Sequence, residues 1–293
     1  TGGRVADAVA ERIPVNGTYN FRDVGGYPVP EGVVRRGKLF RSDGLARLGD
    51  EGRQSLRDLG VRVVIDLRDD FETEVMPDDV DGLDLERLHL PVFEGSGASA
   101  STIGVTLVGL YEKILLQHGD VVVRALQEIA DTGDEAVVVH CTAGKDRTGI
   151  VVALALTAVG VDRETVVADY AATQANLDGQ WLEGMIALVT SHGVEVTPDL
   201  RVILGGSPPE ALEASLDLLD RRFGGVREYL LGAGLSEVEL AKSRKTSWPT
   251  WRSIKRRSSC PGAGFQAVSQ RGLKKARSLV RLLSPLWVRF EVS

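Results

Sequence analysis

One short segment of the chain holds the residues best suited to chemistry: His140-Cys141-Thr142-Ala143-Gly144-Lys145-Asp146-Arg147-Thr148. Five residues separate Cys141 from Arg147, and the segment joins an apolar strand at 136–140 to an apolar helix at 150–159. A loop that curls from a strand into a helix can turn successive backbone N–H groups inward, and the helix N-terminus adds a positive dipole end. The segment therefore predicts a nest for a phosphate or sulfate dianion.

The side chains of this loop have distinct uses in phosphate chemistry. Arg147, in the first turn of the helix, can hold two phosphate oxygens in a planar fork. The same positive surroundings favour the thiolate form of Cys141, which is the nucleophilic form. Thr148 can donate a hydrogen bond to that sulfur and stabilise it as a leaving group. We expect the substrate oxygens to be bound by Thr142, Ala143, Gly144, Lys145, Asp146 and Arg147.

Other interpretations of the loop fit less well. A Walker A loop requires Gly and Ser/Thr where this chain has Val139 and Asp146, and a zinc site requires spaced ligands that the adjacent His140 and Cys141 do not supply. We therefore expect no metal and no cofactor. A sulfur transferase, a catalytically silent phosphate-binding module and a buried structural cysteine stay open as alternatives.

The elements that must position this loop alternate between strands and helices. Short apolar stretches at 61–67 and 85–91 predict strands beside 136–140, and helical periodicity appears at 105–116 and 121–130. An extended pair is predicted from 19–24 and 33–42, a helix from 45–59, and almost wholly helical structure from 163 to 240. This order predicts an α/β fold with a central, mainly parallel sheet flanked by helices and a helical C-terminal half. Ligands bind such sheets beyond the carboxyl ends of the strands, where the loop lies.

Several of these segments resemble a known family. The stretch from His140 to Gly149 is similar to HCxxGxxRTG, the signature of the cysteine-dependent protein tyrosine phosphatase superfamily. Three further segments resemble the bacterial branch of that family: residues 20–27 (NFRDVGGY), 39–42 (LFRS) and 64–68 (VIDLR). The similarity runs from about Ile13 to about Lys242. It implies a phosphatase fold, hydrolysis through a phosphocysteine on Cys141, and phosphorylated protein or phosphoinositide substrates.

The resemblance leaves the proton donor for the leaving group open. Asp146 lies inside the signature loop and is the first candidate, whereas most members of the superfamily use an Asp on a separate loop. Glu94, in the Gly/Ser/Ala segment at 94–101, is the second candidate. Lys145 occupies a position that is often basic in phosphoinositide phosphatases, which favours a multiply anionic substrate.

The remaining polar candidates have supporting roles. Arg22 and Asp23 either line the cleft or brace the turn of the extended pair. Asp66 and Arg68, at the end of a buried strand, are expected to orient the loop. His140 is expected to bond to the backbone near Cys141 and to tune its thiolate.

The net charge of −6 is the sum of two unlike regions. Residues 1–241 contain 22 Lys and Arg against 40 Asp and Glu, and residues 242–293 contain 13 against 1. We assign the phosphatase domain to 1–241 and a basic tail to 242–293. The tail is either a segment for peripheral contact with an anionic membrane or an extension outside the family, disordered or read in another frame. Nucleic-acid binding is not expected, since the tail contains no recognisable module.

The sequence also bears on the compartment. No apolar run reaches the roughly 18 to 20 residues needed to span a bilayer, and the first residues lack the basic-then-apolar order of a signal peptide. We expect a protein of the cytoplasm, or one secreted without a classical signal. Cys141 and Cys260 are the two cysteines of the chain, a number that suits a reducing environment. Nothing in the sequence indicates the oligomeric state.

Overall fold

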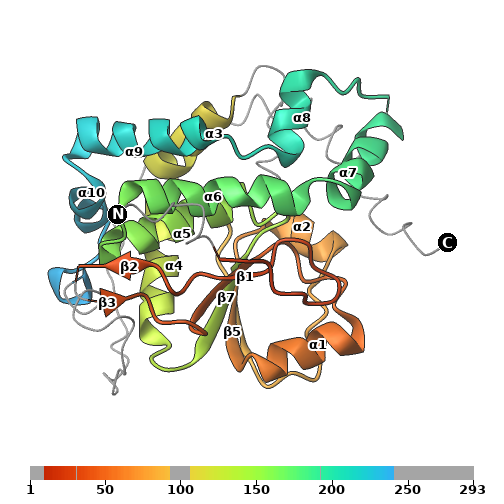
Figure 1. Cartoon of the computed structure of the whole chain (residues 1–293), viewed down its shortest axis with the longest axis horizontal. Coiled ribbons are helices and arrows are strands. Elements are labelled where there is room, and N and C mark those ends of the chain that lie inside the picture. Colours follow the sequence, from red (N-terminus) through yellow and green to blue (C-terminus); the bar gives the residue numbers. More distant parts are fainter. Residues whose placement is uncertain (1–9, 31, 93–105, 192, 241–293) are drawn as a thin grey trace, which may run out of the picture.

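The computed structural model describes residues 10–30, 32–92, 106–191 and 193–240 (Figure 1). Its strands are β1 (Arg22–Asp23), β2 (Pro28–Val29), β3 (Gly32–Val33), β4 (Leu39–Ser42), β5 (Val61–Asp66), β6 (Glu86–His89) and β7 (Ala136–His140). Its helices are α1 (Gly49–Asp58), α2 (Asp70–Val75), α3 (Leu107–Gln117), α4 (Gly119–Asp131), α5 (Asp146–Val159), α6 (Arg163–Leu177), α7 (Gln180–Ser191), α8 (Pro198–Gly205), α9 (Pro209–Phe223) and α10 (Val226–Gly232).

The described strands form one central sheet and one small hairpin. The sheet has the order β1-β4-β7-β5-β6, in which β4, β7, β5 and β6 are parallel and β1 is an antiparallel edge. The predicted extended pair is present only in part, because β1 pairs with β4 while β2 and β3 form a separate hairpin. The register places Ser42 and Asp66 on either side of His140. Three strands therefore end together at the edge where the Cys141 loop begins.

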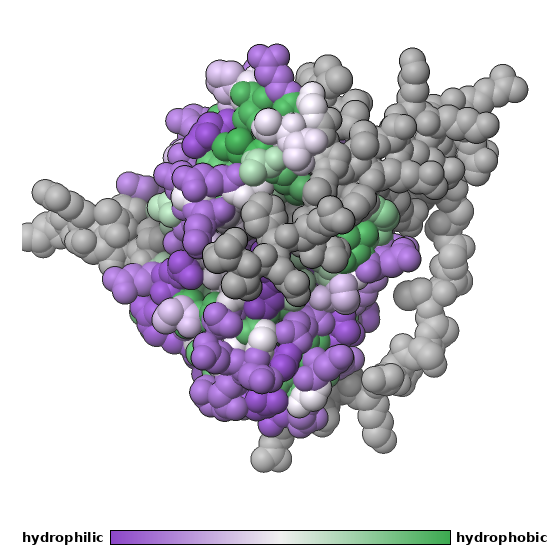
Figure 2. Space-filling model, turned by 90° about the vertical axis from the view of Figure 1, so that its right-hand side faces the viewer, coloured by the Kyte–Doolittle hydropathy of each residue, from purple (hydrophilic) through white to green (hydrophobic). Residues whose placement is uncertain are grey.

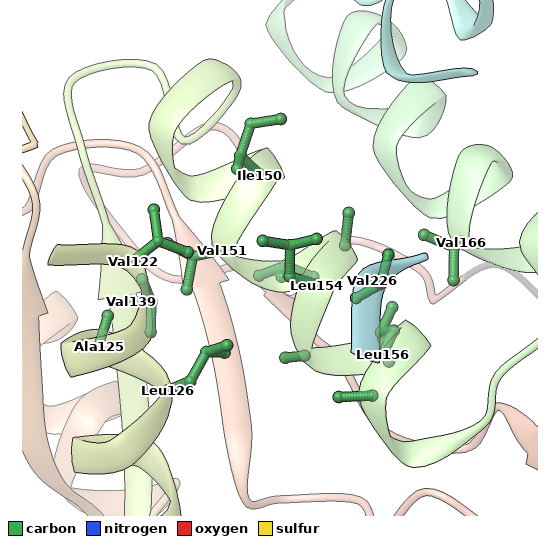
Figure 3. Packing of buried hydrophobic residues seen from close by; sticks show 14 of the residues in the cluster. Val122, Ala125, Leu126, Val139, Ile150, Val151, Leu154, Leu156, Val166 and Val226 are labelled. Atoms are coloured by element: carbon green, nitrogen blue, oxygen red, sulfur yellow. The ribbon is translucent and has the colours of Figure 1, made fainter. Parts of the chain in front are cut away.

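Both faces of the sheet are buried, as the continuous apolar sequence of β7 predicts. Val137 and Val139 pack with α3, α4 and α5, whereas Ala136 and Val138 pack on the other face with residues of α1 such as Leu56. Figure 3 shows Val139 beside side chains of α4 and α5. Because α5 is apolar on nearly every side, it lies between the sheet and an outer layer of helices. This packing fixes both ends of the loop that joins β7 to α5.

The helix boundaries follow local sequence signals in most places. α8 and α9 begin at Pro198 and Pro209, as predicted, because proline suits the first turn of a helix. α1 begins at Gly49, later than the periodicity from residue 45 suggests. The short helix α2 was not predicted. It begins after Asp69, whose side chain accepts a hydrogen bond from the backbone N–H of Glu72 in a capping box.

Some predictions fall outside the described residues. Glu94, Cys260 and the basic tail at 242–293 are among them. Within the described part, no helix is both long enough and apolar enough to cross a bilayer. Figure 2 shows the face on the right-hand side of Figure 1, where hydrophilic residues cover much of the described surface.

Candidate active site

The loop after β7 lies at the carboxyl edge of the sheet, between His140 and the first turn of α5. The side chain of Cys141 is buried, with 2% of its surface exposed. α5 begins at Asp146, so the first N–H groups of a long helix open onto the loop. The carbonyl oxygen of Thr142 accepts a hydrogen bond from the N–H of Gly44, 3.1 Å away. The sequence therefore placed the loop correctly between strand and helix.

Two buried side chains outside the loop donate hydrogen bonds to the carbonyl groups of Ala143 and Gly144. Asn20 Nδ2 donates to the carbonyl oxygens of Ala143 and Gly144, each at 3.1 Å. Arg41 Nη2 donates to the carbonyl oxygen of Gly144 at 2.8 Å. In a planar trans peptide the N–H points opposite to the C=O. The N–H groups of Gly144 and Lys145 consequently point away from Asn20 and Arg41, toward the inside of the loop.

Gly144 is the position of this loop that requires glycine. Its φ is +62°, in the left-handed region. A Cβ atom built on it would lie 2.2 Å from the backbone oxygen of Ser42. The close approach between the loop and β4 is therefore available only without a side chain.

A buried ion pair fixes the side chains that hold the loop. Arg41 Nη1 lies 2.6 Å from Oδ2 of Asp169 on α6, and both side chains are almost fully buried. Arg22 also contacts Asp169 and donates a short hydrogen bond to Asn20. The structure thus places Arg22 behind the loop. The carboxylate of Asp23 instead accepts hydrogen bonds from the backbone N–H groups of Gly25 and Gly37, each at 2.8 Å, and stabilises a turn.

Arg147 is held by a carboxylate that the sequence analysis did not select. Its Nη1 and Nη2 atoms lie 2.5 Å and 2.8 Å from the two oxygens of Glu72 on α2. Thr142 donates a short hydrogen bond to the same carboxylate. Burial alone would raise the pKa of Glu72, but Arg147 and these hydrogen bonds lower it to about 2. Glu72 therefore orients the guanidinium and fixes both ends of the loop.

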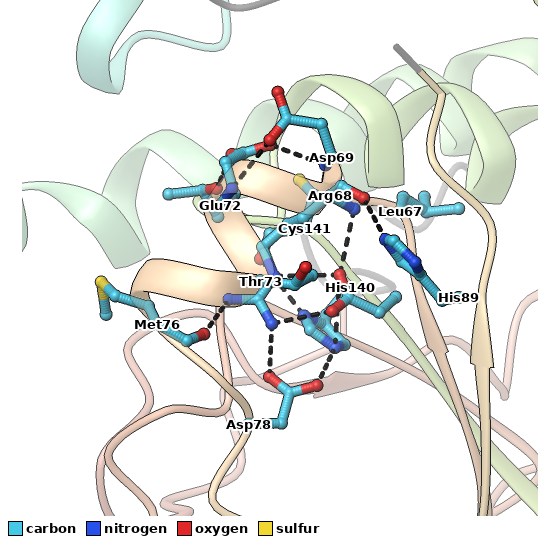
Figure 4. A network of polar contacts seen from close by, with 12 residues as sticks. Leu67, Arg68, Asp69, Glu72, Thr73, Met76, Asp78, His89, His140 and Cys141 are labelled. Atoms are coloured by element: carbon cyan, nitrogen blue, oxygen red, sulfur yellow. Dashed lines mark hydrogen bonds and ion pairs between the residues drawn. The ribbon is translucent and has the colours of Figure 1, made fainter. Parts of the chain in front are cut away.

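Two aspartates, an arginine and a histidine form a buried cluster beside Cys141 (Figure 4). Arg68 Nη2 lies 2.7 Å from Asp66 and 2.8 Å from Asp78. His140 Nε2 lies 3.1 Å from Asp78 Oδ2, and its Nδ1 lies 3.3 Å from the carbonyl oxygen of Cys141. The predicted contact of His140 with the backbone near Cys141 is present. Asp66 and Arg68 lie in this cluster behind the loop.

The same cluster could be considered as a metal site, because ligand atoms of Asp66, Asp78 and His140 lie within 4.8 Å of one another. Arg68 donates to both carboxylates, and its positive charge occupies the place that a cation would need. The donor set therefore suits a hydrogen-bonded ion cluster better than a metal ion.

Asp146 and Lys145 form an ion pair with each other, with Lys145 Nζ 3.4 Å from Asp146 Oδ1, and each has a further partner. Asp146 Oδ1 accepts a hydrogen bond from the hydroxyl of Tyr111 at 2.7 Å. The hydroxyl of Tyr111 is also hydrogen-bonded to the hydroxyl of Tyr170 at 2.6 Å. Lys145 is fully buried, and its Nζ donates to the carbonyl oxygen of Ile203, near the end of α8, at 2.7 Å. Asp146 keeps 22% of its side-chain surface exposed. It is the more accessible of these two loop residues.

Thr148 completes the loop. Its Oγ1 atom is buried, and among the described residues it has no hydrogen-bond partner. A buried hydroxyl without a partner is costly unless something binds to it. The predicted hydrogen bond from this hydroxyl to the sulfur of Cys141 is not formed in the structure, so the role of Thr148 as a donor to the sulfur stays a prediction.

The residues that support the loop from distant segments were not predicted from the sequence. A signal existed for some of them, because Asn20 and Arg41 lie within the NFRD and LFRS blocks. The capping-box spacing of Asp69 and Glu72 could have predicted α2. No local pattern relates Tyr111 or Asp169 to the loop.

Most of the chain is similar to known proteins. The family model described as "Tyrosine phosphatase family" matches residues 13–246. The triple specificity protein phosphatase PtpB of Mycobacterium tuberculosis is 32% identical over 271 residues, which cover 78% of this chain and 96% of that protein. A putative tyrosine-protein phosphatase of Cupriavidus necator is 30% identical, covering 77% and 84%. The solved structure of P. aeruginosa TpbA covers 62% of this chain and 96% of its own at 18% identity, with a TM-score of 0.33.

The Glu72–Arg147 pair predicts a specific pH dependence of stability. Because the pKa of Glu72 is lowered from 4.5 to about 2, its ionised form stabilises the folded state above pH 4.5, and this contribution disappears as the pH falls through about 2. We expect Glu72→Gln to lower the free energy of unfolding by about 3 kcal/mol at neutral pH. The difference from wild type should shrink as the pH falls from about 4.5 to about 2.

Urea unfolding at a series of pH values measures this difference. Glu74→Gln is the matched control, because Glu74 is exposed on the same helix. A difference between Glu72→Gln and wild type that does not change with pH would contradict the assignment.

Proposed function

The chain belongs to the tyrosine phosphatase family, and we propose that it hydrolyses phosphate monoesters of proteins through a phosphocysteine on Cys141. One observation carries the proposal. The loop presents inward N–H groups and the Arg147 guanidinium around a buried cysteine at the N-terminus of α5. Such a nest binds a phosphate dianion and places its phosphorus next to the sulfur.

In the first step the Cys141 thiolate attacks phosphorus in line with the leaving oxygen. The S–P bond forms while the P–O bond to the leaving group breaks, and a carboxylic acid gives its proton to the departing oxygen. Arg147 and the loop N–H groups bind the three equatorial oxygens, where charge accumulates in the transition state. Glu72 holds Nη1 and Nη2 of Arg147, so the orientation of the guanidinium is fixed before a substrate binds.

In the second step water attacks the phosphocysteine. The carboxylate that gave its proton takes one from this water, the S–P bond breaks, and the thiolate returns with inorganic phosphate as product. Thr148 donates to the departing sulfur, which uses the hydroxyl that has no partner among the described residues. Neither step requires a metal or an organic cofactor.

Asp146 is our first candidate for the proton donor, and Glu94 is the second. Asp146 lies in the first turn of α5, and its side chain is partly exposed at the loop. The hydroxyl of Tyr111 fixes one of its carboxylate oxygens, which positions the group. Glu94 lies outside the described residues, so only experiment separates the two.

The substrate class is proposed from one relative and one loop residue. The Mycobacterium relative is named a triple specificity phosphatase, and Lys145 adds a positive charge to the loop. We therefore propose activity on phosphotyrosine, with phosphoserine, phosphothreonine and phosphoinositides as further substrates. In the structure Lys145 bonds to the end of α8, so contact with a second phosphate requires it to leave Ile203. The basic tail would favour an anionic membrane surface as the location of lipid substrates.

Replacing the nucleophile tests the central proposal. We expect Cys141→Ser to abolish turnover of a phosphotyrosine peptide, because serine is not ionised near neutral pH, and to retain peptide binding. Steady-state hydrolysis and calorimetric titration of the peptide measure the two properties. Addition of EDTA to the wild type should leave the rate unchanged. Binding without turnover in the wild type would instead indicate a phosphate-binding module, and turnover in Cys141→Ser would exclude the phosphocysteine.

The proton donor is identified by the dependence of the rate on the leaving group. Loss of the acid should lower kcat by about 10²–10³-fold for phosphotyrosine, whose leaving group needs the proton. The loss should be much smaller for a phosphate ester with an acidic phenol. We expect Asp146→Asn to show this pattern and Glu94→Gln to behave like wild type. The reverse pattern would assign the role to Glu94.

The role of Lys145 in substrate choice is tested by Lys145→Met. If its charge contacts a second phosphate, kcat/KM for a polyphosphorylated inositol lipid should fall by about 10-fold or more, with a smaller change for a phosphotyrosine peptide. Equal losses on both substrates would contradict a lipid-specific role and indicate that Lys145 acts through its contacts with Asp146 and Ile203.

A further inference from the structure

Two buried tyrosines connect Asp146 to helices that are distant in the sequence. Tyr111, on α3, is 0% exposed, and its hydroxyl donates to Oδ1 of Asp146 at 2.7 Å. Tyr170, on α6, is 1% exposed, and its hydroxyl lies 2.6 Å from that of Tyr111. The two rings meet edge to face, with centroids 6.0 Å apart. Side chains of α3 and α6 thus converge on one carboxylate at the start of α5.

The carboxylate at the end of this chain sets the direction of its hydrogen bonds. A tyrosine hydroxyl has one proton to donate. The proton of Tyr111 is used in the bond to Asp146, so Tyr170 donates the bond between the two hydroxyls. Burial, and after it the charge of Asp146, raises the pKa of Tyr111, and burial also raises the pKa of Tyr170. Both hydroxyls therefore keep their protons at neutral pH.

The two carboxylate oxygens of Asp146 have different surroundings. Oδ1 faces the hydroxyl of Tyr111 and the ammonium of Lys145, which lies 3.4 Å away. Within the described part of the chain, Oδ2 has no hydrogen-bond partner. A protonated carboxyl group donates from one oxygen and accepts at the other. Two donors at Oδ1, one of them positively charged, keep that oxygen as the acceptor and leave the proton to Oδ2.

Gly149 allows Tyr170 to approach the helix that carries Asp146. It lies in α5, three residues after Asp146, and a Cβ atom built on it would lie 3.1 Å from Cδ2 of Tyr170. A contact this short would displace the ring by a few tenths of an ångström. The ring of Tyr170 therefore packs against the start of α5 at a position that has no side chain. This gives the glycine at the end of the signature segment a structural reason.

We propose that Tyr111 and Tyr170 are positioning residues for the proton transfer, and that their hydroxyls hold Oδ1 of Asp146 as an acceptor so that Oδ2 carries the transferred proton. The inference rests on the proposed function, in which Asp146 is the proton donor. When the leaving oxygen takes the proton from Oδ2, the electron pair of the O–H bond stays on the carboxylate. The hydroxyl of Tyr111 and the ammonium of Lys145 stabilise that charge, and the water of the second step returns a proton to Oδ2.

Tyr111→Phe removes the hydroxyl and keeps the ring that packs on Tyr170. We expect kcat for a phosphotyrosine peptide to fall about 10-fold, because the carboxyl group then spends less time in the orientation that reaches the leaving oxygen. For a phosphate ester of an acidic phenol, which leaves without a proton, kcat should change little. KM should stay the same for both substrates. Steady-state kinetics with the two substrates measure these values.

Tyr170→Phe tests the chain from its other end. It should give the same dependence on the leaving group with a smaller loss, because Tyr111 keeps its own bond to Asp146. The matched control is Tyr229→Phe. Tyr229 is buried on α10, and its hydroxyl donates to the carbonyl oxygen of Leu115 on α3 at 2.7 Å, so this variant also loses one buried hydrogen bond to that part of the fold. Its kcat should equal that of the wild type on both substrates.

Several results would overturn the inference. One is a folded Tyr111→Phe protein with the wild-type kcat for the phosphotyrosine peptide. Another is an equal loss on both substrates, which would indicate a role in packing alone. A Tyr170→Phe protein with wild-type kinetics would remove Tyr170 from the chain. A leaving-group-dependent loss in Tyr229→Phe would show that the effect is not specific to the hydroxyls behind Asp146.

A double variant separates this inference from the proposed function. If Tyr111 acts through Asp146, adding Tyr111→Phe to Asp146→Asn should cause no further loss of kcat. A further 10-fold loss in that background would overturn the inference and leave Asp146 as the donor. An Asp146→Asn protein with wild-type rates on both substrates would overturn the assignment of the donor, and the inference with it, whereas loss of turnover in Cys141→Ser would still support the phosphocysteine.

Discussion

The structure of this site depends on the orientation of a few peptide groups in the loop that follows β7. A nest for a dianion needs adjacent N–H groups turned inward, and planar peptides then turn the carbonyl groups outward, into the protein. A buried carbonyl without a partner costs about as much as a lost hydrogen bond. Asn20, Arg41 and the N–H of residue 44 supply those partners from β4 and from the chain before and after it. Asn20 and the segment from Arg41 to Gly44 thus support the loop's structure, although none of these partners contributes a side chain to the proposed chemistry.

Two of the side chains that hold the site, Arg41 and Arg147, are charged and buried, and the fold places carboxylates beside them. Arg22 and Arg41 share Asp169, Arg147 is matched by Glu72, and the cluster around Arg68 contains two aspartates and a histidine. Charges removed from water are tolerated only when they are paired and hydrogen-bonded. Each of these groups connects the loop to a different element: α6, α2 and β5. Three ion clusters around the loop therefore maintain its shape. Arg147 belongs to one of them and His140 to another.

The short helix α2 illustrates why part of the site was not predictable. Its capping box is a local signal, so the helix itself could have been recognised from Asp69 and Glu72. That Glu72 reaches Arg147, 75 residues later in the chain, depends on where α2 packs. The same holds for Tyr111 with Asp146, and for Asp78 with His140. The residue types in these pairs are common, and the number of residues between the partners follows no helix or strand period. A single sequence therefore does not show which of its many carboxylates contacts Arg147, Tyr111 or His140.

The sequence by itself identified the candidate loop, the family and the order of the main elements. Cys141, Arg147 and Thr148 lie in one short segment at the junction of the loop and α5, and the alternation of apolar strands and helices predicts the parallel sheet at whose edge this segment lies. Both signals are local, because they depend on spacing within a loop and on hydrophobic periodicity. The tertiary structure decided which groups support that loop: Asn20, Arg41, Glu72 and Asp78. They meet only when the sheet is assembled, since partners for buried carbonyls and charges are selected by position in space, and position depends on the packing of the whole domain.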